Sequence, residues 1–304
     1  MDKGGTSTPF GILLPTMATI AAMASFQIGA AFAKVLFSAV GPQGAASLRL
    51  CLGAALLMAI ARPWRAWPHH APLFPVLALG LSMAGAIVMF YLALDRLPLG
   101  VAMALQFLGP LGIALFGSRR PTDLVWAALA AGGVWCLVGA GPTTTVLDLV
   151  GVAWALGAAT CWATYILCGR AASISFGTST AALAVSIAAL LVLPVGVYHA
   201  GTSLLAPALI PMALLMALFS TAIPFSLEFY ALPRMPARTF AVFMSLEPAF
   251  GVLSGLLILN EVLAEAQIGG VAMVIIAAAG AAWSSGDDTA LDSEPNVVDA
   301  PKPP

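Results

Sequence analysis

The chain has 304 residues, of which 61% are hydrophobic and only 8% are charged, and its mean hydropathy is +1.00. Soluble domains carry about a quarter charged residues, and so few charges cannot cover a soluble globule of this length. The net charge of −1 and the dispersed basic residues also exclude a nucleic-acid-binding surface. The composition therefore predicts a polytopic membrane protein in a lipid bilayer.

Apolar stretches of roughly 18 to 24 residues, each long enough for one helical crossing, recur along the chain. Short segments with turn residues or charges separate them, such as GPQG, DRLPLG and GPTTTVLD. The predicted transmembrane helices are 12–34, 44–61, 73–94, 99–118, 122–140, 149–170, 179–199, 207–232, 238–259 and 264–284.

Both ends of the chain carry further signals. The first apolar stretch resembles a signal peptide near AAFAK, but its single preceding Lys3 and its length favour a retained helix. Residues 285–304 are acidic and contain proline without a long apolar run, which predicts a disordered cytoplasmic tail.

The basic residues predict the orientation. With ten crossings, most of the Lys and Arg residues fall on the side that holds both termini, whereas Lys34 and Arg96 fall on the other side. An excess of Lys and Arg marks the cytoplasmic face. Both termini are therefore expected in the cytoplasm.

The two halves of the chain resemble each other. Residues 96–110 align with 234–248 at an offset of 138, and residues 27–41 align with 163–177 at an offset of 136. The tripeptide GGV at 132–134 recurs at 269–271. Because five helices per half is an odd number, the second copy enters the membrane upside down, as in many transporters.

The predicted domains follow from this repeat. They are a first five-helix repeat at 1–140, a linker at 141–148, a second inverted repeat at 149–284 and the tail at 285–304. The fold class is an all-α membrane protein with ten transmembrane helices in two inverted repeats.

Pro110, Pro224 and Pro248 are among the prolines that lie within predicted membrane helices. Each lacks an N–H and leaves the carbonyl four residues earlier without its helical partner. Irregular backbone at this depth persists only where protein or water satisfies it. These residues are therefore predicted hinges around a polar cavity.

Charged residues inside the membrane are candidates for function. Glu247 is either a proton-titrating group, a partner for a substrate ammonium, or part of a structural ion pair or hydrogen bond, and the sequence leaves these open. For Glu228, pairing with Arg234 or Arg238 is favoured. For Arg49, a structural neutralising role is favoured over binding of a substrate carboxylate.

Polar and aromatic residues on several helices are candidates for the cavity lining. For any single aromatic residue, packing or interfacial anchoring is the better interpretation. The predicted cavity residues are Gln27, Tyr91, Gln106, Phe107, Trp162, Tyr165, Glu228, Ser245 and Glu247.

Other chemistry is sparse. The four cysteines, Cys51, Cys136, Cys161 and Cys168, lack ligand spacing, and His69 and His70 have no acidic or cysteine partners nearby. Phosphate-binding, zinc and nucleophile motifs are missing. We therefore expect no metal, no cofactor and no enzymatic activity.

The stretch SLEFYALPRMPARTFAVFMSLEPAFGVLSGLLILNEVL at 226–263 resembles the second EamA-type repeat of the drug/metabolite transporter superfamily. Residues 47–65, 98–126 and 157–172 resemble bacterial threonine/homoserine exporters of that superfamily. The resemblance implies a ten-helix exporter of small hydrophilic amino acids, located in the inner membrane of a bacterium and driven by the proton gradient. These exporters often carry Glu where this chain has Gln106, which puts proton coupling through that helix in doubt.

The resulting hypothesis is an alternating-access exporter of threonine or homoserine, with protons and the lipid bilayer as further partners. One alternative keeps the fold and changes the cargo to aromatic amino acids, drugs or other small solutes. An intramembrane enzyme and a non-transporting scaffold are disfavoured. The sequence does not give the oligomeric state.

Overall fold

The computed structural model describes residues 9–65, 72–117, 121–139, 148–231 and 243–285. The described part is helical and contains no strand. Its main helices are α1 (Pro9–Ala61), α2 (Phe74–Leu94), α3 (Leu99–Gln106), α4 (Leu108–Gly117), α5 (Pro121–Gly139), α6 (Leu149–Phe176), α7 (Thr180–Ala200), α8 (Ile210–Ala217), α9 (Ile223–Ala231), α11 (Glu247–Leu259) and α12 (Glu265–Ser285).

Each range predicted as a transmembrane helix contains helix, with some differences in length. The sixth extends to Phe176 rather than ending near residue 170, and only the second part of 238–259 is described, as α11. Five segments are long and apolar enough to cross a membrane by length and composition: Leu14–Arg65, Phe74–Leu94, Leu149–Gly169, Thr180–Leu205 and Pro207–Leu227. The chain is therefore an all-α membrane protein.

Two glycines with positive φ angles divide long helical segments. Gly41 has φ 68° and ψ 171° inside α1, so the helix is interrupted there and the first two predicted spans meet at this residue. Gly177, with φ 52°, begins the short 3-10 helix Gly177–Ser179 between α6 and α7. Only glycine adopts such backbone angles without a steric cost, and these two glycines occupy equivalent positions in the proposed sequence repeat.

The helices are also irregular near the three prolines that were predicted as hinges. Phe107 separates α3 from α4 just before Pro110. A π-helical turn, η5 (Leu218–Ala222), joins α8 to α9 just before Pro224. Residues 245 and 246 form a turn before α11, in which Pro248 is the second residue. The prolines therefore stand at the places where the helical hydrogen-bond pattern is interrupted, as their missing N–H groups require.

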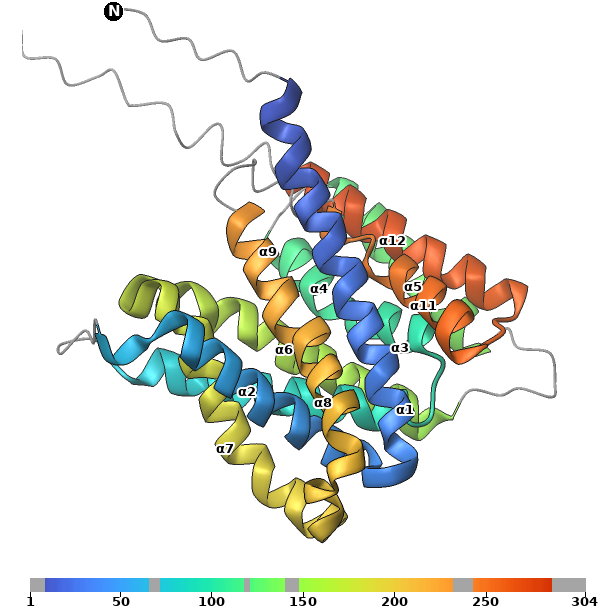
Figure 1. The fold of residues 1–304 in the computed structure, drawn as a ribbon. Helices are drawn as coiled ribbons and strands as arrows, with labels where there is room; N and C mark the ends of the chain where they lie inside the picture. Colours follow the sequence, from blue (N-terminus) through green and yellow to red (C-terminus); the bar gives the residue numbers. More distant parts are fainter. Residues whose placement is uncertain (1–8, 66–71, 118–120, 140–147, 232–242, 286–304) are drawn as a thin grey trace, which may run out of the picture.

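Most of the extensive helix packing joins the first half of the chain to the second. In Figure 1, α1 runs beside α8 and α9, and α12 lies along α5. The pairs with the largest contact are α2 with α6, α1 with α7, and α5 with α12. The two halves are thus interleaved, and neither forms a separate bundle.

The contact between α5 and α12 is reciprocal. A Cβ atom on Gly133 would lie 2.9 Å from the Gly270 carbonyl oxygen, and one on Gly270 would lie 2.8 Å from the Gly133 carbonyl oxygen. Val274 adjoins Gly133, and Leu137 adjoins Gly270. Each member of this contact has its counterpart 137 residues away, as expected for a contact on a two-fold axis.

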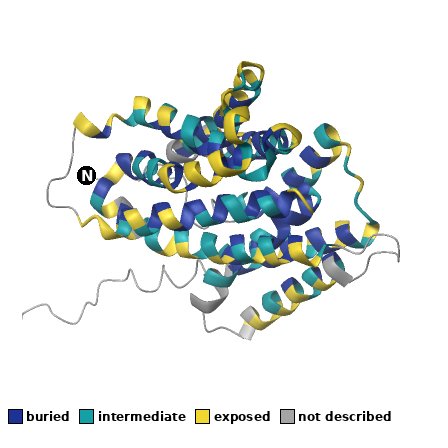
Figure 2. Cartoon of the chain, turned by 90° about the horizontal axis from the view of Figure 1, so that it is seen from below, coloured by how far each residue is buried: buried dark blue, intermediate teal, exposed yellow. Residues whose placement is uncertain are grey.

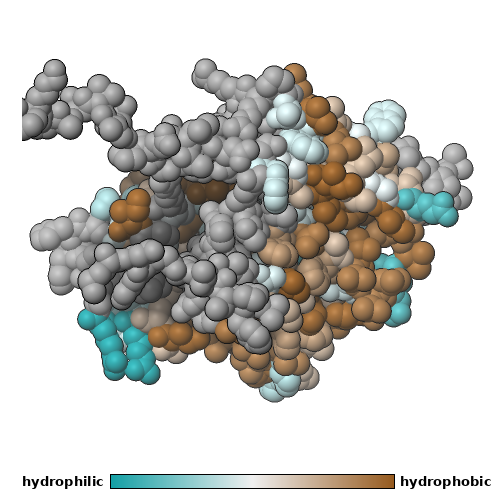
Figure 3. Space-filling model, turned by 90° about the horizontal axis from the view of Figure 1, so that it is seen from above, coloured by the Kyte–Doolittle hydropathy of each residue, from teal (hydrophilic) through white to brown (hydrophobic). Residues whose placement is uncertain are grey.

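The outer surface of the helical body is apolar. Buried residues lie where helices face one another, and exposed ones lie on the outer sides (Figure 2). Hydrophobic residues cover much of the coloured surface in Figure 3, and hydrophilic ones lie mostly at its margins. Leu190, Leu257 and Trp135 are each more than 70% exposed. Such a surface is stable in lipid and aggregation-prone in water.

Candidate substrate cavity

A cavity lies between helices of both halves of the chain. Inside it, the space that water molecules can occupy is ≈ 20 Å³, about enough for one water. Residues from α1, α2, α3, α6, α7, η5 and α9 form its wall: Phe26, Arg49, Leu50, Met83, Ala86, Ile87, Phe90, Gln106, Trp162, Val185, Thr221 and Phe225. The wall is mostly apolar with a few polar groups, which is the usual composition of a small-molecule site.

Arg49 supplies the one cationic side chain of this wall. It is only 3% exposed, and its guanidinium lies 4.9 Å from the centre of the Phe26 ring. One terminal nitrogen donates to the Ser220 carbonyl at 3.1 Å, and the other lies 3.4 Å from the Tyr91 hydroxyl. The Arg49 Nε has no hydrogen-bond partner among the described residues.

The Ser220 carbonyl that Arg49 contacts belongs to the π-helical turn η5. Pro224, four residues later, cannot donate to this carbonyl because it has no N–H, whereas the guanidinium of Arg49 does donate to it. The Ser25 hydroxyl donates to the neighbouring Phe219 carbonyl at 2.8 Å. Two side chains of α1 therefore stabilise the interrupted backbone between α8 and α9.

Two glutamines near the cavity have buried amide atoms without partners among the described residues. Gln106 lines the cavity, and its Oε1 accepts no hydrogen bond. Gln27, beside the lining residue Phe26, is fully buried, and neither its Oε1 nor its Nε2 is paired. Unpaired buried amides are costly and rare, so these atoms mark a place suited to a polar ligand or ordered water.

The predicted aromatic residues divide into two groups. Trp162 lines the cavity, and Tyr165 stacks on it with ring centres 4.6 Å apart; Tyr91 is fully buried beside Arg49. Phe107 is not among the lining residues and packs instead in an apolar cluster with residues of α5 and α12, including Ala130 and Ala277.

Within the described part of the chain, the predicted acidic residues are not placed in the cavity wall. Glu247 is 8% exposed and Ser245 is 1% exposed, but neither is among the lining residues. Glu247 occupies the first turn of α11, where the helix dipole favours a carboxylate. The side chain of Glu228 lies outside the described part of the structure, as do Arg234 and Arg238.

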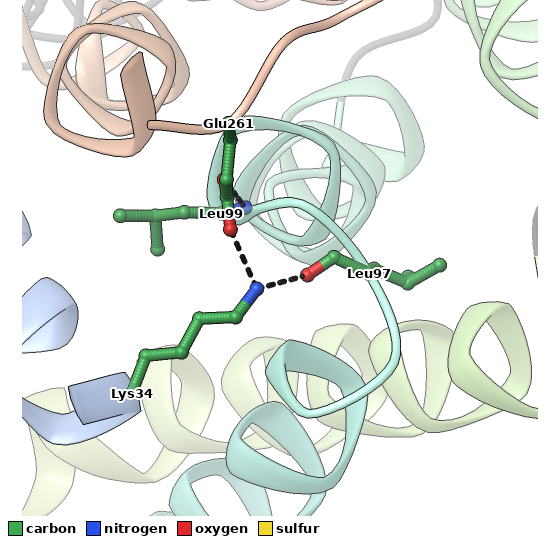
Figure 4. Close-up of polar contacts among 4 residues, drawn as sticks. All are labelled: Lys34, Leu97, Leu99 and Glu261. Carbon is green, nitrogen blue, oxygen red and sulfur yellow. Dashed lines mark hydrogen bonds and ion pairs between the residues drawn. The ribbon is translucent and has the colours of Figure 1, made fainter. Parts of the chain in front are cut away.

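An ion pair joins three segments away from the cavity. Lys34 of α1 donates to Glu261 Oε1 at 2.6 Å and to the Leu97 carbonyl at 3.0 Å (Figure 4). Glu261, in the loop after α11, also accepts from the Leu99 N–H at 2.7 Å through Oε2. Its carboxylate thereby pairs with an N–H at the start of α3, which has no intrahelical partner.

A second ion pair closes the connection into α6. Asp148 pairs with Arg96 through Oδ2 and accepts from the Val150 N–H at 2.8 Å through Oδ1. Hydrogen bonding to Arg96, assisted by these backbone contacts, lowers the pKa of Asp148 below its ordinary value. Both Arg96 and Asp148 are solvent-accessible, so the contribution of this pair to stability is small.

Several cavity residues were not predicted from the sequence. Phe26, Phe90, Thr221 and Phe225 line the cavity, and so does Arg49, for which a structural role was favoured over binding of a substrate carboxylate. The position of Arg49 as a lone cation within an apolar helix was the available signal. The described residues contain no cluster of three or more His, Cys, Asp or Glu side chains that suits a metal ion.

Comparisons with known proteins are consistent with this geometry. Residues 149–283 match the EamA-like transporter family. The chain is 44% identical to the threonine/homoserine exporter RhtA of Escherichia coli K12 over 91% of this chain and 94% of that protein. The same protein from Salmonella typhimurium LT2 is 43% identical over the same shares.

A crystal structure with 23% sequence identity shows a similar fold. It superposes with a TM-score of 0.59 and covers 88% of this chain and 95% of that one. At this identity the similarity concerns the fold alone. Because the identity to the RhtA proteins extends over nearly the whole chain, this membrane transport protein belongs to the EamA-like transporter family.

Proposed function

We propose that the protein is an inner-membrane exporter of small amino acids, with threonine and homoserine as substrates. The observation that carries the proposal is the 43–44% identity, over 91% of the chain, to proteins named threonine/homoserine exporter. The cavity with a few polar groups supports it, because a small hydrophilic solute needs such partners to cross lipid.

Ten membrane crossings in two inverted repeats are part of this proposal. Three symmetric features support them: the positive φ angles of Gly41 and Gly177, the reciprocal contact of Gly133 with Gly270, and the interruptions at Phe107 and Ser245, which are 138 residues apart. The distribution of Lys and Arg supports cytoplasmic termini.

Transport requires the helices around the cavity to move, because the space within it suits about one water and not an amino acid. The halves are interleaved, so rotating one half as a rigid body against the other would break most of the packing. Bending at the interruptions near Pro110, Pro224 and Pro248 is therefore the favoured motion. Glu247 is the candidate for proton coupling, since it is a buried carboxylate in a membrane helix.

The test is transport by purified protein in liposomes loaded with labelled threonine or homoserine, with and without an imposed pH gradient. The proposal predicts movement of both amino acids above protein-free liposomes and faster movement with the gradient. If neither amino acid moves while labelled phenylalanine does, the cargo is aromatic. No effect of the gradient would remove the proton-coupling part alone.

A further inference from the structure

The charge balance of the cavity is incomplete. Among the described residues the ion pairs are Lys34 with Glu261 and Arg96 with Asp148, and neither involves Arg49. Arg49 is nevertheless 3% exposed and always protonated. Its contacts are the Ser220 carbonyl, the hydroxyl and ring of Tyr91, and the Phe26 ring, none of which carries a negative charge.

A lone cation in the membrane interior is unfavourable. The Phe26 ring and the Ser220 carbonyl offset part of this cost through their electrostatic attraction. The unpaired Nε shows that the guanidinium has an unused donor, and Arg49 lines the cavity. A carboxylate is the group that fits, because it accepts charge-assisted hydrogen bonds from the guanidinium and supplies the missing negative charge.

The same cavity has an unused acceptor. Gln106 Oε1 is buried, has no partner among the described residues and belongs to another helix, α3. An amide oxygen accepts hydrogen bonds only, so it suits an ammonium or hydroxyl group. The cavity therefore carries a fixed cation on α1 and an unpaired acceptor on α3.

We infer that Arg49 binds the carboxylate of the substrate and that Gln106 Oε1 accepts a hydrogen bond from its ammonium group. This inference rests on the proposed function and narrows it: the cargo is a free α-amino acid with an unblocked carboxylate. Amines without a carboxylate, amino-acid amides and cationic drugs lack the group that Arg49 requires and are excluded as substrates.

The test compares threonine with threonine amide, in which the carboxylate is neutral. Binding to purified protein is measured by competition against labelled threonine, for the unaltered chain, Arg49→Gln and Arg49→Lys. Arg65→Gln is the matched control, because Arg65 is an exposed cation of the same repeat outside the cavity wall. The unaltered chain and Arg65→Gln are expected to prefer threonine by about tenfold or more, the usual effect of a charge-assisted hydrogen bond.

In Arg49→Gln this preference is expected to fall to about twofold or less, and Arg49→Lys keeps part of it. If Arg49 had a purely structural role, Arg49→Gln would instead weaken the binding of threonine and of threonine amide by the same factor, and the preference for threonine would be unchanged. That outcome overturns the inference, as does equal binding of the two compounds to the unaltered chain.

Two further measurements keep the inference testable if Arg49→Gln does not fold. The ligand comparison on the unaltered chain tests the carboxylate without any substitution. Gln106→Leu tests the contact with the ammonium group. It is expected to weaken the binding of threonine about tenfold and that of N-acetylthreonine hardly at all, because N-acetylthreonine lacks the ammonium group. Equal weakening of both overturns the Gln106 assignment.

The exporter proposal and the role of Arg49 can be tested separately. If purified protein neither binds nor transports threonine, homoserine or any other amino acid, the exporter proposal is wrong. If threonine binds and the amide competes equally well, only the role of Arg49 is wrong.

Discussion

Gln27 combines complete burial with an amide that makes no hydrogen bond to the described residues. Each such group loses its hydration without compensation, at a cost of about 1–3 kcal/mol. We therefore expect the amide of Gln27 to form hydrogen bonds in another state of the protein, either with bound substrate or during the conformational change of transport.

We therefore predict that Gln27→Leu raises the free energy of unfolding by about 1 kcal/mol and lowers the rate of threonine transport. Stability is read from the unfolding temperature in detergent, and transport from liposomes. Lower stability together with unchanged transport would show that the amide has a structural partner such as an ordered water.

Glu247 allows a direct test of proton coupling. Its carboxylate is buried and lies in the first turn of α11. Replacement by Gln keeps the size and removes the titratable proton, so Glu247→Gln is expected to abolish acceleration by a pH gradient while exchange of threonine between equal pools continues. The rates are measured at several external pH values. An unchanged pH profile would assign Glu247 a structural role.

Individual residues were harder to predict than their segments. Of the predicted cavity residues, Gln106 and Trp162 line the cavity, whereas Phe107 packs towards α5 and α12. The reason is rotational: neighbouring residues on a helix point about 100° apart, and the sequence shows no helical face when both lipid-facing and buried faces are apolar. For Arg49 the sequence favoured a structural role over a ligand role; its contacts with Tyr91 and Ser220 join residues distant in sequence, which a local pattern does not contain.

At the level of elements, Glu261 joins three segments. Its carboxylate pairs with Lys34 of α1 and accepts from the Leu99 N–H at the start of α3. We predict that Glu261→Met destabilises the protein by about 1–3 kcal/mol, and that Lys34→Met costs less because the Leu99 contact remains. Unfolding temperatures in detergent give both values.

Glu265→Gln is the control for Glu261, because Glu265 is an exposed acid in the first turn of α12. Its unfolding temperature is expected to match that of the unaltered chain. An equal loss in Glu261→Met and Glu265→Gln would attribute the effect to net charge rather than to the contacts of Glu261.

Pro224 allows a test of the interrupted helix. Pro224→Ala introduces an N–H four residues after Ser220, which can compete with Arg49 for the Ser220 carbonyl. The substitution is expected to preserve or raise thermal stability and to slow transport about tenfold, because α8 and α9 then bend less readily. Transport at the original rate would show that the interruption is not a hinge.

The elements themselves were largely predictable, because apolar length and turn residues determine where a helix crosses lipid. The interruptions near Pro110, Pro224 and Pro248 were also expected, since proline acts on its own helix. The π-helical turn at Leu218–Ala222 was not; it depends on contacts from Ser25 and Arg49 of another helix, which a local pattern does not contain.

For the whole molecule, the reciprocal contact of α5 with α12 predicts a symmetric response to substitution. Gly133→Ala and Gly270→Ala each place a Cβ atom within 3 Å of the opposite backbone and are expected to lower stability by about 1–3 kcal/mol. Gly269→Ala is the control, because nothing lies within 4 Å of a Cβ atom there. Unchanged stability in both Gly133→Ala and Gly270→Ala would show that α5 and α12 can move apart at little cost in free energy.

The interleaved packing has a consequence for biosynthesis. Helices are made in chain order, so α1 enters the membrane before α7, α8 and α9, its principal partners in the second half, have been synthesised. Until η5 arrives, the guanidinium of Arg49 has no Ser220 carbonyl to contact, and holding such a charge in lipid costs about 2.5–3.5 kcal/mol on insertion scales. A ribosome that stalls between the two halves would thus leave a nascent chain in which the part of α1 that carries Arg49 is poorly anchored, and such a fragment is a natural target for membrane quality-control proteases.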